Sequence, residues 1–178
     1  MIRYAITDPL TLDFNYLEHD LKRFSQKASM IVYRDKDNAN YAYNAKLFVE
    51  NAKGFEKVLL HREYLQANTF GADGVHLSST QFRDISKAKK LGLFVVISTH
   101  TPDEAKLAKA LGADMITYSP VFETPNKGKA LGLKALEALL QTVDIPVIAL
   151  GGILTQEQID SCEKSGASGF ASIRYFAD

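Results

Sequence analysis

The stretch Gly71-Ala72-Asp73-Gly74-Val75-His76-Leu77 decides the fold. Its first glycine accepts the left-handed conformation that ends a helix, and the apolar residues that follow favour a strand. The same device recurs as Gly112-Ala113-Asp114-Met115 and as Gly166-Ala167-Ser168-Gly169. Three copies of one helix-to-strand turn predict a chain in which helices and strands alternate.

Short apolar runs on both sides of these turns predict eight strands. Runs that are apolar on both faces are typical of strands covered on both sides, and their alternation with helical patterns predicts parallel pairing through right-handed crossovers. The predicted strands are Ile2 to Thr7, Met30 to Tyr33, Lys57 to His61, Gly74 to Leu77, Phe94 to Ser98, Met115 to Tyr118, Pro146 to Leu150 and Gly169 to Ile173.

The connecting segments have the periodicity and the caps of helices. Thr101-Pro102-Asp103-Glu104 and Thr155-Gln156-Glu157-Gln158 each place a capping hydroxyl three residues before an acid or amide that can bond back, so each predicts a helix start. Helical spacing predicts two apolar faces, one made of Phe14, Leu17, Leu21 and Phe24 and the other of Ala105, Leu107, Ala108 and Leu111.

These elements predict an α/β fold, a minimal (β/α)8 TIM barrel forming one domain over residues 1–178, at about 22 residues per unit. Only Tyr175 to Asp178 follow the last strand, so the eighth helix is expected to be reduced or missing. Its loss would expose apolar strand and favour a homodimer. A doubly wound open sheet is the structural alternative.

Charge and cysteine content exclude several classes. With 21 basic and 21 acidic side chains the formal net charge is zero and the pI is about 6.9, so no general attraction to nucleic acid or to a membrane surface is expected. One cysteine, Cys162, cannot form an internal disulfide. No span of about 18–20 apolar residues and no signal peptide is found, and a cytoplasmic protein is expected.

In such a barrel the active site lies at the carboxyl ends of the strands. Three of the four histidines stand there, His61, His76 and His100, together with Ser98. The histidines are candidates for catalysis or binding rather than three independent structural side chains. We expect His61 and Ser98 to bind substrate.

Two groups of residues predict an anion site. The loop Gly151-Gly152 precedes a capped helix, where glycine lets amides approach a phosphate, and Ser172, Ile173 and Arg174 close the neighbouring last strand. Arg34 and Lys36 lie two apart after the second strand, which places two cations at the barrel mouth.

The sequence lacks the motifs of several other functional classes. Metal-site patterns are absent, namely paired cysteines, histidines at i and i+4, and an Asp-x-Asp run. The sequence also lacks a Gly-x-Ser-x-Gly elbow, a Walker-type loop and a nucleic-acid module.

The strand-end motifs, in this order, resemble the thiamine phosphate synthase and TenI family over nearly the whole chain. The matching segments are Gly71 to Leu77, Ser98 to Thr101, Gly112 to Asp114, Ser119 to Lys127 and Ile145 to Ile153. The resemblance implies a TIM barrel and a phosphorylated thiazole or pyrimidine ligand. It implies the joining of hydroxymethylpyrimidine diphosphate to thiazole phosphate, with pyrophosphate released and magnesium holding the diphosphate.

The resemblance also implies roles for individual residues. Arg34 and Lys36 are similar to the family's pyrophosphate-binding pair. Thr124 and Lys127 are similar to the threonine and lysine that contact thiazole phosphate and pyrophosphate, with Asn126 in place of a second threonine. Gly152, Ser172 and Ile173 fall where the family binds the thiazole phosphate by backbone, and Arg174 replaces a small hydroxyl residue there.

Some positions depart from the pattern. Val32 stands where synthases usually have a pyrimidine-contacting glutamine. Arg62 and Gln81 stand where synthases have the carboxylates that hold magnesium, so no strongly bound cofactor is expected. The magnesium-independent TenI branch, which resembles a thiazole tautomerase, fits this loss better, yet its histidine is replaced by Pro120.

Three functional hypotheses therefore stay open. In a transferase, Arg34, Lys36, Lys127 and Arg62 would stabilise the departing pyrophosphate. In a tautomerase, His100 or His76 would shuttle a proton on the thiazole carboxylate. A regulatory barrel would bind a phosphorylated ligand without turnover.

Overall fold

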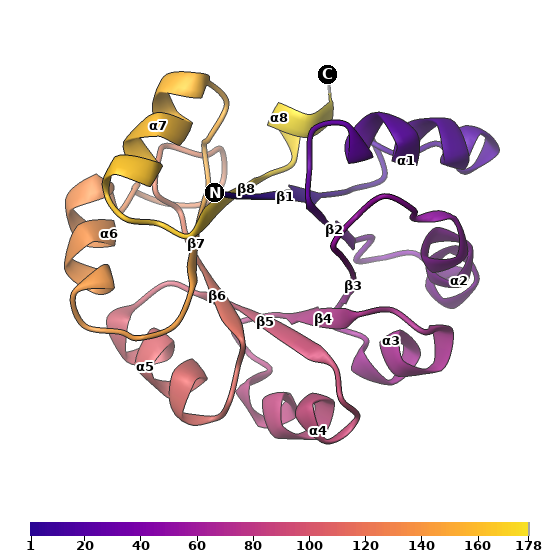
Figure 1. Ribbon diagram of the computed structural model, residues 1–178, viewed down its shortest axis with the longest axis horizontal. Helices are drawn as coiled ribbons and strands as arrows, with labels where there is room; N and C mark the ends of the chain where they lie inside the picture. Colours follow the sequence, from indigo (N-terminus) through magenta and orange to yellow (C-terminus); the bar gives the residue numbers. More distant parts are fainter. Residues whose placement is uncertain (178) are drawn as a thin grey trace.

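A computed structural model describes residues 1–177, in which eight parallel strands close into a barrel (Figure 1). Each strand pairs with the next, and β8 pairs with β1, so the predicted barrel is confirmed and the open sheet is wrong. The strands are β1 (Ile2–Ile6), β2 (Met30–Tyr33), β3 (Lys57–His61), β4 (Gly74–Leu77), β5 (Phe94–Thr99), β6 (Met115–Tyr118), β7 (Val147–Leu150) and β8 (Gly169–Ser172).

A helix follows each strand and lies outside the ring of strands (Figure 1). Short 3-10 turns, Phe14–Tyr16 and Phe82–Asp84, precede α1 and α4. The helices are α1 (Leu17–Ser25), α2 (Tyr41–Asn51), α3 (Tyr64–Phe70), α4 (Ile85–Lys90), α5 (Pro102–Ala110), α6 (Leu133–Leu140), α7 (Gln156–Lys164) and α8 (Arg174–Ala177).

The repeated turn works as the sequence predicts. Gly71, Gly112 and Gly166 have φ values of 75°, 93° and 96°. The amide of the alanine after each glycine bonds back to a carbonyl five residues earlier, which satisfies the end of the helix. A fourth turn of this type, at Gly92 with φ 77°, was not predicted, because Leu91-Gly92-Leu93 lacks the Ala-Asp that marks the others.

The aspartates of two of these turns tie neighbouring strands together. A carboxylate oxygen of Asp73 accepts the Val58 amide, and one of Asp114 accepts the Val95 amide, each at 2.7 Å. Each carboxylate therefore holds the start of its own strand to the start of the strand before it.

The two predicted helix starts are confirmed. Thr101 caps α5 and Thr155 caps α7, where Gln158 completes the reciprocal bond. In α5 the reciprocal bond differs, since Glu104 accepts from the amide of His100 at 2.6 Å rather than from Thr101. Each pair satisfies amides that the helix itself leaves without acceptors.

One predicted helix face is confirmed and the other is partly wrong. Leu17, Leu21 and Phe24 are buried, with Phe14 packed beside them. In α5 Ala105 and Ala108 are buried, whereas Leu107 and Leu111 are 47% and 38% exposed. The two alanines let α5 lie close to the barrel, so the larger leucines fall on the flank that faces solvent.

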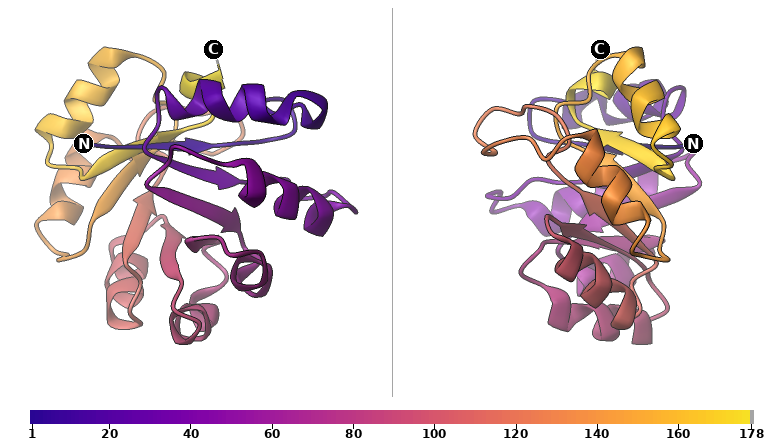
Figure 2. Two further views of the ribbon diagram at one scale, coloured as in Figure 1. Left: turned by 45° about the vertical axis from the view of Figure 1, so that its right-hand side comes forward. Right: turned by 90° about the vertical axis from the view of Figure 1, so that its left-hand side faces the viewer.

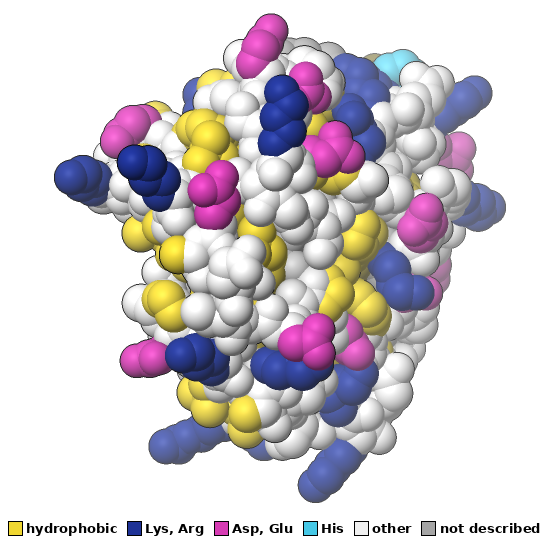
Figure 3. Space-filling view, turned by 60° about the vertical axis from the view of Figure 1, so that its left-hand side comes forward, with side chains coloured by type: hydrophobic (Ala, Val, Ile, Leu, Met, Phe, Trp, Pro, Cys, Tyr) yellow, Lys and Arg dark blue, Asp and Glu magenta, His cyan; other side chains and the backbone are white. Residues whose placement is uncertain are grey.

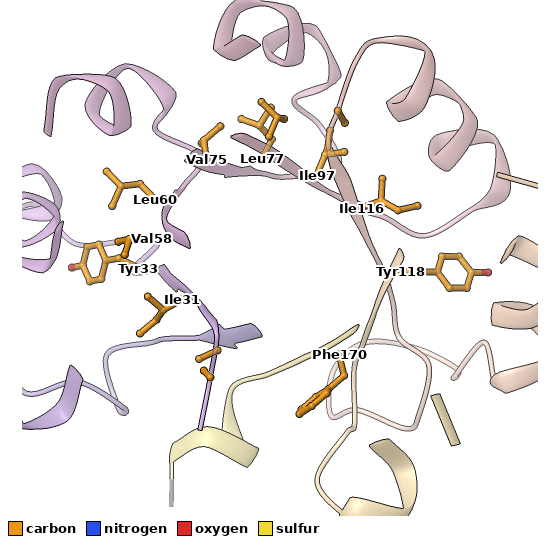
Figure 4. Close-up of a cluster of buried hydrophobic side chains, with 14 of the residues drawn as sticks. Ile31, Tyr33, Val58, Leu60, Val75, Leu77, Ile97, Ile116, Tyr118 and Phe170 are labelled. Atoms are coloured by element: carbon orange, nitrogen blue, oxygen red, sulfur yellow. The ribbon is translucent and has the colours of Figure 1, made fainter. Parts of the chain in front are cut away.

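The apolar side chains form two packed regions, one inside the barrel and one between the barrel and the helices. Figure 4 shows strand side chains such as Ile31, Leu60 and Ile116 pointing outward toward the helices. The inner group fills the end of the barrel at which the strands begin. Only the end at which the strands finish can therefore hold a ligand. It consists of Tyr4, Ile6, Met30, Val32, Leu59, Val96, Met115, Ile148 and Ala171.

The eighth helix is a single turn, as predicted, but the expected exposure of apolar strand is wrong. All four residues of β8 are buried. Phe176 of α8 is fully buried and stacks on Phe170, with ring centroids 5.5 Å apart and an interplanar angle of 9°. Arg23 of α1 donates to the carbonyl of Ala177, and Figure 2 shows α8 beside α1. β8 therefore exposes no apolar surface that would favour a homodimer.

The surface agrees with the balanced charge. On the face in Figure 3 basic and acidic side chains are interspersed, with small hydrophobic groups between them. Among the helices of residues 1–177, none has both the length and the apolar character needed to cross a membrane.

Candidate functional site

A cavity of about 290 Å³ opens at the carboxyl ends of the strands. Every strand contributes a lining residue at its end or in the loop that follows it, as expected for this barrel. The lining residues are Ile6, Arg34, Lys36, His61, Arg62, His76, Ser78, Ser79, Ser98, His100, Ser119, Pro120, Thr124, Lys127, Leu150, Gly151, Gly152, Leu154, Ala171, Ser172, Ile173 and Arg174.

The fold brings together all but one of the residues predicted for the site. Asn126 is the exception, since it is exposed and does not line the cavity. Its φ of 62° lies in the left-handed region, which asparagine tolerates better than most residues. In this structure Asn126 therefore serves the turn of the loop rather than the cavity.

Four cationic side chains line the cavity. Within residues 1–177, the side chains of Arg34, Lys36, Arg62 and Lys127 form no ion pair or hydrogen bond. The positive charge of Arg34 lowers the pKa of Lys36, with burial and the charges of Lys127 and Arg62 adding to the effect. The cluster is therefore electrostatically unfavourable until an anion enters.

The backbone of Arg62 is held in an unusual conformation. Its φ is 70°, a value uncommon outside glycine. The Arg62 amide donates to the carbonyl of His76 at 2.9 Å, and its carbonyl accepts from Gln81 at 3.1 Å. Gln81 also accepts from the Ser78 amide at 3.0 Å, so it links the loop after β4 to the loop after β3. Such strain is typical of functional sites.

The glycines after β7 have a packing reason in addition to any ligand. Gly151 and Gly152 have φ values of 100° and 68°. A Cβ on Gly152 would lie 2.4 Å from the carbonyl oxygen of Glu123, and one on Gly151 would lie 2.7 Å from Cα of Pro120. The loop after β6 therefore rests directly on the loop after β7, and glycine alone permits this approach.

Backbone amides without acceptors nevertheless lie in the loops after β7 and β8. Within the described chain no hydrogen bond is made by the amides of Gly152, Ile153 and Ile173. The amides of Leu154 and Thr155, which precede α7, are not part of this set because both donate to Gln158, and no residue of α7 itself lines the cavity. The amides available to a phosphate at the cavity thus come from the loops after β7 and β8 and not from the first turn of α7.

The side chains of Ser172 and Arg174 differ in whether they are free to bind a ligand. The buried hydroxyl of Ser172 donates to the carbonyl of Ile153 at 2.9 Å and accepts from the amide of Tyr175 at 3.2 Å. Its side chain is thereby committed to joining β8 to the loop after β7. Arg174 is exposed, and its guanidinium has no ion-pair partner among the described residues.

His61 and His76 are both held neutral. Burial lowers the pKa of His76 to about 3 and that of His61 to about 2, with the positive charge of Arg34 acting in the same direction on both. His76 also has both ring nitrogens engaged, with Tyr4 Oη at 2.9 Å and Ser98 Oγ at 3.0 Å. Both features oppose the predicted proton shuttle at His76, because its ring nitrogens are bonded and its burial disfavours the protonated form.

His100, unlike His76, has one ring nitrogen bonded and the other facing no partner in residues 1–177. It is exposed at the cavity, and its Nδ1 lies 2.8 Å from the carbonyl oxygen of Ser119. A carbonyl only accepts, so Nδ1 carries a hydrogen, and in the neutral imidazole Nε2 has the lone pair. No partner for Nε2 is found within residues 1–177. His100 is thus oriented as a proton acceptor.

The loop after β6 brings Thr124 and Lys127 to the cavity. The Thr124 hydroxyl donates to the carbonyl of Phe122 at 3.0 Å, and the Lys127 amide donates to the carbonyl of Thr124 at 3.3 Å. The side chain of Lys127 is exposed and has no ion-pair partner among the described residues. The loop therefore presents an exposed ammonium group at the cavity.

The donors that line the cavity do not suit magnesium held by the protein. None of the lining residues is an aspartate or glutamate, while five are lysine or arginine. The Gln81 oxygen is already an acceptor for Ser78. No group of three or more metal-ligating His, Cys, Asp or Glu side chains is found within residues 1–177. Magnesium prefers carboxylate and phosphate oxygens, so the site suits an anion instead.

Several lining residues were missed as site residues. Ser78, Ser79, Ser119 and Pro120 follow strand ends, so their position was a usable signal. Ile6, Leu150 and Ala171 could have been found from the alternation of inward and outward side chains along a strand. Leu154 carries no such signal.

Comparisons with known proteins agree with this geometry. The family model described as thiamine monophosphate synthase matches residues 3–176. The chain is 38% identical over 181 residues to the putative thiamine-phosphate synthase 2 of Aquifex aeolicus, covering 98% of this chain and 97% of that one. It is 27% identical over 179 residues to the thiamine-phosphate synthase of Lactococcus lactis, covering 89% and 81%.

A solved structure agrees as well. The thiamine phosphate pyrophosphorylase from Pyrococcus furiosus superposes with a TM-score of 0.82 at 25% identity, covering 97% of this chain and 85% of that one. A structure titled Native KDPGal superposes with a TM-score of 0.79 at 16% identity, covering 97% and 82%, which shows a shared fold alone.

Proposed function

Because the chain belongs to the thiamine monophosphate synthase family, we propose that it acts in thiamine biosynthesis as a transferase that joins hydroxymethylpyrimidine diphosphate to thiazole phosphate. The observation that carries this proposal is the cluster of Arg34, Lys36, Arg62 and Lys127. Four cations without an ion-pair partner in residues 1–177, beside a cavity lined by no carboxylate, suit a diphosphate better than any neutral ligand.

The reaction requires these residues to stabilise a leaving group. The bond between the hydroxymethyl carbon and the diphosphate oxygen breaks, and the electron pair leaves with pyrophosphate. The thiazole nitrogen then forms the new bond to that carbon. The four cations stabilise the growing negative charge on pyrophosphate, and they are already in place before the reaction begins.

The second substrate would be held by the loops after β7 and β8. The free amides of Gly152, Ile153 and Ile173 would bind the phosphate of the thiazole, with Thr124 and Arg174 beside it. In this arrangement the two substrates would use different sets of lining residues for their phosphorylated groups. It leaves the space between them for the two heterocycles.

Metal independence is part of the proposal. A cation about 4 Å from the Arg62 guanidinium would meet a repulsion of some kcal/mol per unit charge at an effective dielectric of about 20. We therefore expect a chelator to change product formation little. Strong magnesium dependence in the unaltered protein would contradict this part of the proposal.

The test is to incubate the protein with both substrates and measure thiamine phosphate and pyrophosphate, with magnesium and with a chelator. Arg62→Asn removes the charge while keeping a residue that tolerates the left-handed backbone. It is expected to lower kcat/KM roughly 10–100-fold, the value of one charge-assisted contact. Arg83→Asn, which alters an exposed arginine outside the cavity, is the control.

One observation favours a second candidate, a thiazole tautomerase. The free Nε2 of His100 is oriented as a proton acceptor at the cavity wall. A tautomerase would lose activity in His100→Gln, whereas the transferase would keep most of its own. A protein that binds inorganic pyrophosphate or thiazole phosphate but turns over neither set of substrates would be the non-catalytic barrel.

A further inference from the structure

A groove lies on the outside of the barrel beside the short last helix. α8 has four residues, whereas α4 has six and α2 has eleven, and α8 stands between α7 and α1 (Figure 1). The groove has a volume of about 580 Å³. Its lining joins the first two residues of α8 to residues from the start of β1, the end of α1 and the loop after β7. The lining residues are Arg3, Lys27, Leu154, Arg174 and Tyr175.

The groove concentrates positive charge on a molecule whose net charge is zero. Arg3, Lys27 and Arg174 line it, and no lining residue is an aspartate or glutamate. Neither Arg3 nor Arg174 has an ion-pair partner within residues 1–177. A concave surface lined by cations without acids attracts anions.

The guanidinium of Arg3 is held in place before any ligand arrives. Arg3 Nε donates to the carbonyl of Lys27 at 2.7 Å, and Nη2 donates to Tyr175 Oη at 3.0 Å. Its central carbon lies 5.4 Å from the ring centroid of Phe170 and 5.5 Å from that of Tyr175. A guanidinium fixed in this way loses little conformational freedom when it binds an anion.

Several donors of the groove have no acceptor in the described chain. Both hydrogens of Arg3 Nη1 and the second hydrogen of Nη2 are in this state, because the two printed bonds use one hydrogen each on Nε and Nη2. Arg174 is exposed, and its guanidinium makes no hydrogen bond to residues 1–177. Two guanidinium groups with free N–H donors suit the oxygens of a phosphate group.

The groove is separate from the substrate cavity but shares part of its wall. Leu154 and Arg174 line both spaces, whereas Arg3, Lys27 and Tyr175 line the groove and not the cavity. A response at Arg3 therefore reports on the groove, and a response at Lys127 reports on the cavity.

We propose that this groove is a second anion-binding site, which takes the phosphate group of a small organic molecule between the guanidinium groups of Arg3 and Arg174. The apolar surface beside the charges favours an ester over the bare ion, because Leu154 is 42% exposed and the Tyr175 ring also lines the groove. The site goes beyond the proposed function, since neither substrate of the transferase is needed to fill it.

The site is tested by proton–nitrogen NMR of the arginine Nε–H groups in protein labelled with nitrogen-15 arginine. The Arg3 signal is identified by its absence in Arg3→Lys. Inorganic phosphate and phenyl phosphate are titrated at constant ionic strength, with chloride as the balancing salt. We expect the Arg3 signal to shift and saturate, with a Kd on the order of 1 mM for inorganic phosphate.

The two probes also test the apolar wall. Phenyl phosphate is expected to bind roughly threefold or more tightly than inorganic phosphate. Equal affinities would overturn the preference for an organic ester. A shift that never saturates, or that chloride reproduces, would overturn the site itself, because general screening acts without a defined stoichiometry.

Three variants separate the groove from the cavity. Arg174→Gln is expected to weaken the binding seen at Arg3 about threefold to tenfold, the value of one charge-assisted contact at an exposed position. Arg83→Gln is the matched control, since Arg83 is also exposed but lines neither space. Lys127→Ala alters the cavity alone and should leave this Kd unchanged. Equal Kd values in Arg174→Gln and the parent would overturn the role of Arg174.

The outcome at Arg3 does not depend on turnover. If the protein forms no thiamine phosphate, the proposed transferase fails, while the saturable shift of the Arg3 signal still supports or refutes the groove. If Lys127→Ala weakens the response at Arg3 as much as Arg174→Gln does, the signal reports on the cavity, and the proposal of a separate site is wrong.

Discussion

Burial of titratable side chains near the site makes protonation costly for the folded chain. His76 is neutral when folded, since its pKa is lowered to about 3. An unfolded chain would take up a proton on this residue below about pH 6.5. Stability is thus complete above pH 6.5 and is lost as the pH falls toward the folded pKa.

The first prediction concerns this dependence. Between pH 6.5 and 5, the parent is expected to lose up to ~1.4 kcal/mol of unfolding free energy per pH unit from His76 alone. His76→Gln removes that share of the slope, whatever its effect on stability at neutral pH. The measurement is urea unfolding at several pH values.

Parent and His76→Gln proteins with the same pH dependence would show that His76 takes up a proton as readily in the folded chain as in the unfolded chain, contrary to its burial.

At the level of elements, the loop after β6 differs from the helices on either side of it. Lys127 is exposed at the cavity, whereas Lys106 of α5 and Lys134 of α6 are exposed on helix surfaces away from it. Proline, glycine and asparagine in this loop favour turns over helix, and such loops often close over ligands.

The second prediction is that Lys127→Ala weakens binding of inorganic pyrophosphate by roughly 10-fold or more. Lys106→Ala and Lys134→Ala should leave the affinity unchanged, because screening by salt removes the effect of distant charges. Calorimetric titration checks all three variants. Equal effects would show that the loop is a connector and not part of the binding site.

The third prediction concerns the start of α7. Thr155→Ala should cost about 1 kcal/mol of unfolding free energy, because the backbone amide of Gln158 loses the Thr155 hydroxyl oxygen that accepts its hydrogen bond. Thr155→Ser keeps the acceptor and should retain most of that stability. Chemical unfolding measures the difference, and equal losses in both variants would mean that the hydroxyl contributes nothing.

For the whole molecule, barrel closure depends on the shortest helix. Phe176 covers Phe170, and Tyr175 hydrogen-bonds Arg3 at the start of β1, with 3.0 Å between Arg3 Nη2 and Tyr175 Oη. The end of the chain thereby covers β8, which lacks a full helix.

The fourth prediction is that Phe176→Ala lowers the unfolding free energy by about 3–5 kcal/mol, the usual cost of emptying a buried aromatic site. Leu111→Ala is the control, since this leucine is 38% exposed and should cost less than about 0.5 kcal/mol. A loss below about 1 kcal/mol for Phe176→Ala would show that the last turn is not needed to seal the barrel.

Much of the fold was predictable because its signals are local. The αβ turns at Gly71, Gly112 and Gly166 and the caps at Thr101 and Thr155 each depend on a few adjacent residues. The apolar composition of the strands likewise predicts that both of their faces are buried. The positions of Arg34, Lys127 and Gly152 at the cavity follow from the rule that strand ends meet at one end of a barrel.

The sequence by itself thus determined the elements, their parallel order and most of the residues around the cavity. Only the tertiary structure decided closure between β1 and β8, the exposed flank of α5 and the neutral, bonded state of His76, whose partner Tyr4 is 72 positions away in the chain. The physical reason is that helix and strand patterns act over a few residues, whereas dehydration and charge at a site depend on residues that only folding brings together.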